Sequence, residues 1–151
     1  MPDPEEVLSA PYTLQYEYKR SLGPIIGRFL TGLRDGQIFG VRTRDGRVMV
    51  PPAEYDPETG ETLSECVAVG DSGEVVSWCW VSEPRRAQPL DRPFAFALIK
   101  LDGADTALLH AVDGGESSNM RTGMRVKVRW QDERVGRIED IACFEPAEGA
   151  S

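Results

Sequence analysis

The chain is poor in the residue types that enzymes use for nucleophilic chemistry. Its 151 residues include one histidine and three cysteines, and no Gly-x-Ser-x-Gly motif occurs. A catalytic triad would need Cys66, Cys79 or Cys143 to meet His110 through folding alone. We therefore expect no catalytic residue in this chain. His110 is expected to be a packed strand residue that makes one or two hydrogen bonds.

The cysteines are too widely spaced to form a metal site. No pair has the Cys-x-x-Cys spacing of a zinc ribbon. Cys79 and Cys143 lie in apolar runs, where a free cysteine behaves as a small hydrophobic residue. The N-terminal sequence MPDPEE is acidic, unlike a secretory signal, and no membrane span is visible. These absences predict a cytoplasmic protein with reduced thiols.

Basic residues are fewer than acidic ones. Seventeen lysines and arginines face 25 aspartates and glutamates, which gives a net charge of −8. Nucleic-acid binding depends mainly on basic surface, so this balance argues against a general DNA or RNA binder. The hydrophobic content of 40% supports a real core, and 11 prolines with 15 glycines indicate many turns and short strands.

The local pattern predicts one helix near the N-terminus. Apolar residues within 25–33 repeat with helical spacing. Gly23-Pro24 is expected to open this helix, because proline is tolerated in a first turn, and Asp35-Gly36 to close it. The preceding segment 12–20 is rich in tyrosine and is either a separate short helix or an extended arm. Residues 1–11 carry prolines among acids and are expected to be disordered.

A hairpin and a series of short strands follow the helix. Asp45-Gly46 between apolar runs predicts the hairpin, which Pro51-Pro52 ends because proline has no N–H for a strand ladder. Apolar and polar residues alternate most clearly over 124–131, which indicates a half-buried strand. Short strands without a long helix between them fit a small closed barrel. The predicted strands are 37–42, 47–50, 64–69, 74–81, 94–101, 106–112, 125–130 and 138–144.

The stretch 46–60 has the outline of a zinc-ribbon knuckle without its metal ligands. A zinc ribbon needs a thiolate or imidazole pair on each of two arms, with a turn glycine after each pair. Those positions hold Arg42 and Asp45 on one arm, and Asp56 and Thr59 on the other, while the glycines remain. We interpret the stretch as a degenerate knuckle held by packing, with no zinc or other metal expected. The alternative is hard-cation binding through Asp45, Asp56 and Glu58.

Six short segments follow one another along the chain in an order typical of one family. They are Phe29-Leu-Thr-Gly-Leu33, Gly46-Arg-Val-Met-Val-Pro-Pro52, Gly73-Glu-Val-Val-Ser77, Pro93-Phe-Ala-Phe-Ala-Leu-Ile-Lys-Leu-Asp102, Gly123-Met-Arg-Val-Lys-Val128 and Cys143-Phe-Glu-Pro-Ala147. With these segments the chain resembles the DUF35 OB-fold proteins, which associate with acyl-CoA enzymes. The resemblance implies a mainly β fold. A small OB-type β-barrel is preceded by an N-terminal helix and a degenerate, metal-free rubredoxin-like zinc-ribbon hairpin. The expected parts are the arm and helix at 1–35, the hairpin at 36–62, the barrel at 63–146 and a mobile tail at 147–151.

The resemblance also implies a function. It predicts a noncatalytic accessory subunit of a thiolase-like enzyme, a lipid-transfer-type thiolase or aldolase, that acts on acyl-CoA thioesters. The subunit would help assembly, active-site access or CoA binding. We expect no tightly bound cofactor, a coenzyme A thioester at a shared site, and neither nucleic acid nor membrane as a partner.

Two sets of residues are predicted to carry this role. A cluster of cations on the strand 125–130 and just before it suits the phosphates of CoA, because arginine presents a fork of donors, although a solvated strand face needs no function. These candidates are Arg121, Arg125 and Lys127. The candidates for the partner interface are Phe29, Leu33, Pro51, Pro52 and Tyr55.

The second interpretation is an OB-fold module that binds single-stranded nucleic acid or a small ligand. Trp78 and Trp80 lie two residues apart, as do Phe94 and Phe96, so each pair shares one face of a strand. Together the four rings would form a stacking platform for bases. The same rings also suit a partner interface or the core.

Overall fold

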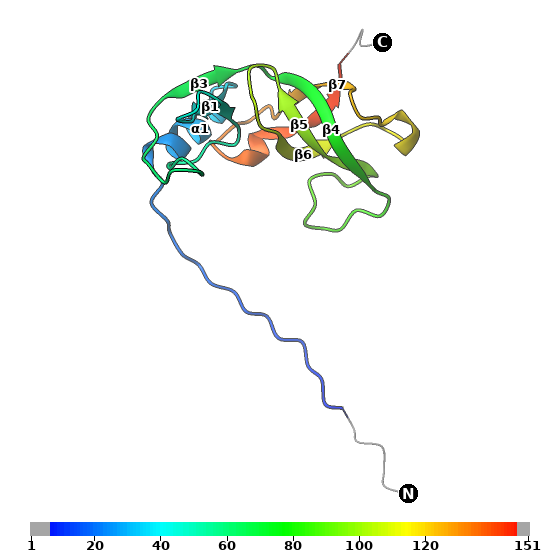
Figure 1. The fold of residues 1–151 in the computed structure, drawn as a ribbon. Coiled ribbons are helices and arrows are strands. Elements are labelled where there is room, and N and C mark those ends of the chain that lie inside the picture. Colours follow the sequence, from blue (N-terminus) through cyan, green and yellow to red (C-terminus); the bar gives the residue numbers. More distant parts are fainter. Residues whose placement is uncertain (1–6, 148–151) are drawn as a thin grey trace, which may run out of the picture.

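A small sheet and a closed barrel form the two β parts of the structure (Figure 1). The computed structural model describes residues 7–147. The elements are α1 Pro24–Arg34, β1 Ile38–Arg42, β2 Val48–Met49, β3 Cys66–Val69, β4 Ser72–Val81, β5 Phe94–Leu101, β6 Leu108–Val112, β7 Arg125–Trp130 and β8 Ile141–Pro146, with short 3-10 helices at Ser117–Asn119 and Ile138–Asp140.

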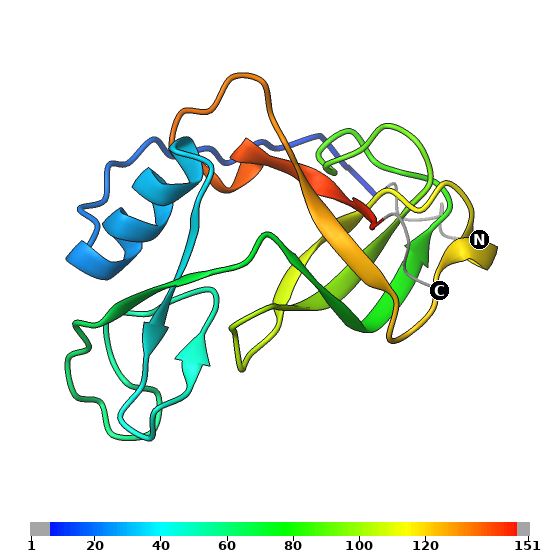
Figure 2. The same ribbon diagram turned by 90° about the horizontal axis from the view of Figure 1, so that it is seen from above.

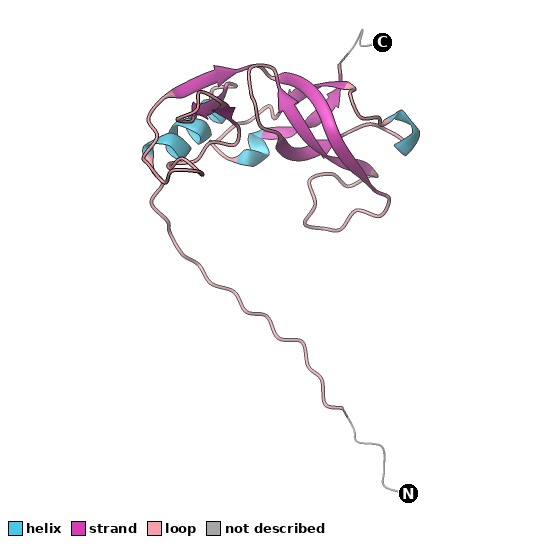
Figure 3. Cartoon of the chain, viewed as in Figure 1, coloured by secondary structure: helices cyan, strands magenta, loops and turns pink. Residues whose placement is uncertain are grey.

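The strand order defines both parts. The small sheet has the order β2-β1-β3, and the barrel closes in the order β4-β5-β6-β8-β7. Strands predominate over helices (Figure 3). Figure 2 shows α1 and the small sheet together on one side of the molecule and the barrel on the other side. The predicted fold class, mainly β with a small OB-type barrel after an N-terminal helix, is confirmed.

Helix α1 begins and ends where the sequence predicts. Pro24 stands in its first turn, and the chain turns at Gly36 with a φ of 75°, a conformation that favours glycine. The Glu54 side chain accepts hydrogen bonds from the N–H groups of Ile25 at 3.3 Å and Ile26 at 2.9 Å. These donors have no partner within the helix, and the helix dipole favours a negative group there. Glu54 therefore ties the start of α1 to the loop after β2.

The buried face of α1 belongs to the same core as the barrel. Phe29 and Leu33 pack in one cluster with Ile38 of the small sheet and Val69 at the end of β3. That cluster continues into the barrel interior through residues such as Phe144. The helix, the small sheet and the barrel therefore stabilise one another and share a single hydrophobic core.

Strands β5 and β7 have the predicted bounds, whereas β8 starts later than predicted. Residues Ile138–Asp140 form a 3-10 helix in place of the first strand residues. Its geometry follows from the buried Asp140 carboxylate, which accepts hydrogen bonds from the N–H groups of Val135, Gly136 and Arg137. These bonds draw the backbone into a turn before β8.

The hairpin part extends past the boundary predicted at residue 62. Strand β3 pairs antiparallel with β1, from Ile38 opposite Val69 to Val41 opposite Cys66. The knuckle sheet therefore takes its third strand from the segment that we assigned to the barrel. The segment 12–20 is an extended arm and not a helix. The first six residues and the predicted tail beyond Ala147 lie outside the described residues.

No helix in the described part of the chain is both long enough and apolar enough to cross a membrane.

Because the buried face of α1 packs in one cluster with the small sheet and the barrel, we predict that α1 stabilises the whole fold. Leu33 is 0% exposed, so Leu33→Ala should lower the free energy of unfolding by about 2–5 kcal/mol. Urea denaturation followed by far-UV circular dichroism measures the change. The matched control is Leu98→Ala, because Leu98 lies on β5 but is 40% exposed, and it should cost about 1 kcal/mol or less. Equal losses for the two variants would show that α1 is not part of the core.

Candidate functional site

The carboxylate of Asp56 joins the two arms of the knuckle. Its Oδ2 accepts a hydrogen bond from the N–H of Arg44 in the first arm, at 2.8 Å. Its Oδ1 accepts those of Glu58 and Thr59 in the second arm, at 2.9 and 3.1 Å. The residue is 4% exposed. The N–H donors of Arg44, then Glu58 and Thr59, lower the pKa of Asp56, because they stabilise its charged form.

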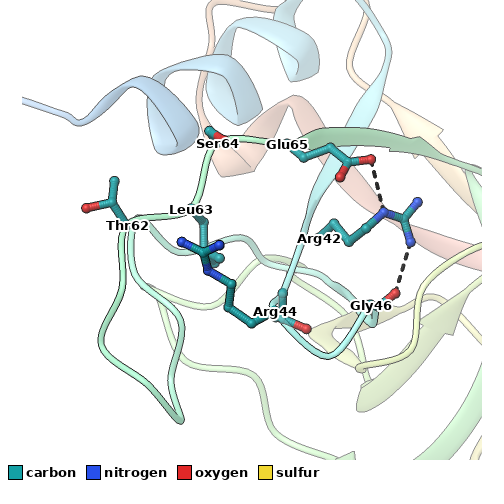
Figure 4. Close-up of a pocket in the computed structure, with 8 residues that line it drawn as sticks. Arg42, Arg44, Gly46, Thr62, Leu63, Ser64 and Glu65 are labelled. Atoms are coloured by element: carbon teal, nitrogen blue, oxygen red, sulfur yellow. Dashed lines mark hydrogen bonds and ion pairs between the residues drawn. The ribbon is translucent and has the colours of Figure 1, made fainter.

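The remaining polar side chains of the knuckle pair with one another. Arg42 donates to the Glu65 carboxylate at 3.0 Å and to the Gly46 carbonyl at 2.9 Å (Figure 4). Arg47 donates to Asp45 through Nε at 2.7 Å. Between the first arm and the segment 62–65 lies an open hollow of about 300 Å³ that Arg42 and Glu65 help to line. The first arm is therefore held by ion pairs at the positions that carry ligands in a zinc ribbon.

These residues do not fit a metal ion. In residues 7–147 no three His, Cys, Asp or Glu side chains form a group that would hold one. Asp56 already accepts three backbone hydrogen bonds, and Glu58 pairs with Arg47 at 3.2 Å. This geometry therefore gives no support to hard-cation binding through Asp45, Asp56 and Glu58. Metal analysis of the purified protein remains the direct test for zinc.

His110 is a packed residue of β6. Its Nδ1 accepts a hydrogen bond from the N–H of Ala111 at 2.9 Å, and its ring meets Phe144 edge-on at 5.5 Å between centroids. Burial lowers the pKa of His110, although the backbone of Ala111 and of Ile138 opposes the shift. The side chain is therefore neutral near pH 7, and the geometry agrees with the packed strand residue that we predicted.

The cysteines do not supply a nucleophile beside this histidine. Among residues 7–147 no hydrogen bond joins His110 to a cysteine. Cys143 is fully buried, and burial raises the pKa of its thiol, which disfavours the reactive thiolate. Cys79, predicted to pack in an apolar run, is exposed, and Cys66 is half-buried.

The cations on the outer face of β7 are neutralised by acidic neighbours. Arg125 donates two hydrogen bonds to Asp102, one of them at 2.8 Å, and this pairing lowers the pKa of that carboxyl. Lys127 and Arg129 both pair with Glu145, at 3.9 and 3.2 Å. A phosphate on this strand would have to displace these carboxylates.

Arg121 differs from the other two predicted CoA-phosphate residues. Within the described chain no acidic side chain lies at ion-pair distance from it. Arg121 and Arg125 line one hollow of about 340 Å³ together with Ser118 and Asn119, and Lys127 is not among its lining residues. The structure therefore brings two of the three candidates together.

The aromatic platform predicted for nucleic-acid binding is wrong. Trp78 lies opposite Ala97 in the β4–β5 ladder, and Phe96 lies opposite Cys79. Residues directly opposite each other share one face of a sheet, and neighbours along a strand alternate between faces. The tryptophans therefore point to the barrel core, which they contact, while Phe94 and Phe96 point to the outer face, with ring centroids 4.9 Å apart.

A hollow of about 450 Å³ lies between the β4–β5 loop and the β7–β8 loop. None of its lining residues is a lysine or arginine, so it offers no charge for a phosphate. The lining residues are Ala87, Gln88, Pro89, His110, Gln131, Ile138, Glu139, Ile141 and Ala142. Sequence reasoning missed this hollow because its walls come from segments far apart in the chain.

The predicted partner interface needs one correction. Phe29 and Leu33 are 6% and 0% exposed and fill the shared core, so their side chains do not reach a partner. Pro51 and Tyr55 are exposed, Tyr55 by 61%, and Pro52 is half-buried. The interface prediction therefore now rests on the loop 51–55.

Comparison with known proteins agrees with this architecture. A family model described as the C-terminal OB-fold domain of ChsH2 matches residues 66–131, which hold β3 to β7. A DUF35-family protein of unknown function from Sulfolobus solfataricus shares the fold, with a TM-score of 0.60 and 21% identity over 83% of this chain and 85% of that one. No curated protein sequence matches the chain.

The Ltp2-ChsH2(DUF35) aldolase also shares the fold. Its TM-score is 0.61 at 18% identity, over 85% of this chain and 98% of that one. These matches agree with a small OB-type barrel. With both structural neighbours described as DUF35, the chain's resemblance to the DUF35 OB-fold proteins is confirmed.

The Asp56 bridge predicts an acid-sensitive knuckle. In Asp56→Asn one oxygen becomes an NH₂ group, which faces an N–H donor and cannot accept, so the thermal midpoint at pH 7 should fall by several degrees. Folding lowers the pKa of Asp56, so the charged side chain stabilises the folded protein. This contribution is fully present above the pKa that Asp56 has in the unfolded chain, near 3.8. It is lost as the pH falls from there through the lower folded value, so the difference between the two proteins should begin to shrink below about pH 4.

Thermal melts from pH 7 to pH 3 measure this difference. The matched control is Asp132→Asn, an exposed aspartate outside the knuckle, which should melt like the natural protein. A difference between Asp56→Asn and the natural protein that persists unchanged at pH 3 would contradict the assignment of a charged bridge.

Proposed function

We propose that this protein is a noncatalytic accessory subunit of a thiolase-like enzyme, a thiolase or aldolase that acts on acyl-CoA thioesters. The observation that carries the proposal is the likeness to the ChsH2(DUF35) part of an aldolase, which extends over 98% of that chain. In support, the described residues bring His110 into hydrogen-bond contact with no cysteine. The subunit helps assembly of the enzyme or access to its active site.

The subunit also binds CoA directly, and Arg121 is the main residue of this contact. Its guanidinium is not engaged by a carboxylate in the described chain, and it shares a hollow with Arg125, Ser118 and Asn119. Arginine forks suit the geometry of phosphate groups. Arg125 joins this site by exchanging Asp102 for phosphate, and Lys127 contributes only long-range charge because it pairs with Glu145.

The nucleic-acid alternative has no observation in its favour. The tryptophan and phenylalanine pairs lie on opposite faces of the sheet, and the cations of β7 are paired with carboxylates.

The partnership is tested by tagging the protein in its native cell and identifying co-purified proteins by mass spectrometry. We expect a thiolase-fold protein at a defined stoichiometry, because an exposed loop and arm on a stable barrel suit a permanent partner. Zinc content is read on the same sample. Recovery of the chain alone, from cells that express it at natural levels, would contradict the proposed function.

The CoA role predicts that Arg121→Ala weakens CoA binding by the purified complex about tenfold, since one charge-assisted hydrogen bond is lost. Isothermal titration calorimetry with free CoA measures the affinity. Arg125→Ala should have a smaller effect, because Asp102 already competes for that guanidinium. The control is Arg86→Ala, an exposed arginine of the β4–β5 loop. Unchanged affinity in Arg121→Ala would exclude a phosphate contact at this hollow.

A further inference from the structure

The arm before α1 is an extended segment that packs on nothing else in the described chain. Residues 7–22 form neither helix nor strand, and the arm points away from the body of the molecule (Figures 1 and 3). Its segment 12–18 carries large apolar side chains that are 62–84% exposed. These are Tyr12, Leu14, Tyr16 and Tyr18. An arm with this composition is unusual, because large apolar groups normally find cover.

The order of residues in the arm fits a β-strand and no other regular element. From Tyr12 to Lys19 the sequence YTLQYEYK alternates strictly between apolar and polar residues. In a strand all the apolar side chains lie on one face and all the polar ones on the other. In a helix, at 3.6 residues per turn, Tyr12 and Tyr16 would lie on one side and Leu14 and Tyr18 on nearly the opposite side.

The root of the arm is fixed against the exposed loop 51–55. A Cβ atom at Gly23 would lie 2.2 Å from Cδ of Glu54, so a side chain at position 23 would displace this carboxylate. Glu54 in turn holds the first turn of α1 through Ile25 and Ile26. Tyr55, which follows Glu54, is 61% exposed. The root of the arm therefore lies beside the loop 51–55, on the α1 side of the molecule (Figure 1).

We propose that residues 12–19 bind the enzyme subunit as an added β-strand, an inference that rests on the proposed function. The backbone of the arm pairs with an open sheet edge of the thiolase-like partner, and alternate side chains enter apolar pockets beside that edge. At about 3.3 Å per residue the paired segment is about 26 Å long, with pockets about 6.6 Å apart. The tyrosines supply large contact area and keep their hydroxyls near solvent.

A second copy of this chain is the less favourable occupant. The part of β4 from Ser77 to Val81 pairs only with β5, so it is itself an open edge in the described structure. Docking there would bring together two chains that each carry a net charge of −8, and like charge opposes association.

The test compares purified variants for their affinity to the thiolase-fold subunit recovered by the tagged protein. Tyr16→Ser removes an apolar side chain from the binding face and should weaken binding at least tenfold. Gln15→Ser changes the opposite face and should bind within about twofold of the natural chain. Gln15→Pro removes one backbone N–H without touching the apolar face, and a loss of tenfold or more there identifies strand pairing.

Deletion of residues 1–20 provides the decisive comparison, because it keeps Gly23 and the Glu54 contact. The deleted protein should keep its thermal midpoint and lose the enzyme subunit. If the full chain recovers the enzyme and the deleted chain recovers it equally well, the inference fails while the proposed function stands. If the full chain recovers no thiolase-fold protein, the proposed function itself fails. Light scattering that shows a dimer for the full chain and a monomer for the deleted one would assign the arm to a second copy and overturn the inference.

Discussion

Backbone N–H groups at turns and helix ends need acceptors, and this chain supplies them with carboxylates. Asp56 accepts hydrogen bonds from both arms of the knuckle, Glu54 from the first turn of α1, and Asp140 from the turn before β8. An unsatisfied buried donor costs as much as a lost hydrogen bond, so each of these side chains fixes a local path of the chain. The excess of acidic residues is thus partly structural and only partly a property of the surface.

The carboxylate of Asp56 explains how a zinc-ribbon outline persists without soft ligands. In a ribbon the metal ties two short arms that have too little apolar surface to hold together alone. Here one carboxylate oxygen serves each arm, and the apolar side of the small sheet packs into the core shared with the barrel. Hydrogen bonds between its arms and packing of the small sheet against the core therefore hold the knuckle together. Its geometry depends on the charge of Asp56.

Local patterns predicted the elements well where one rule dominates. Proline at position 24 sets the start of α1, and the alternation over 125–130 sets β7, because these signals need no distant partner. The start of β8 was not predictable in the same way, since Asp140 imposes a 3-10 turn on residues that are apolar enough for a strand. The aromatic platform failed because spacing along a strand does not say which face of the sheet two neighbouring strands share.

Phe29 and Leu33 were predicted to contact a partner but are buried within the chain. They show how little an apolar helix face says about which molecule covers it. An amphipathic helix shows that one side is covered, but not whether its own chain or a partner covers it. The small sheet and the barrel cover the apolar face of α1, so this face is buried within the chain itself. The arm has the same kind of one-sided pattern with the period of a strand, and its apolar residues from Tyr12 to Tyr18 are exposed. This contrast is why we propose the arm, and not the helix, as the contact with another molecule.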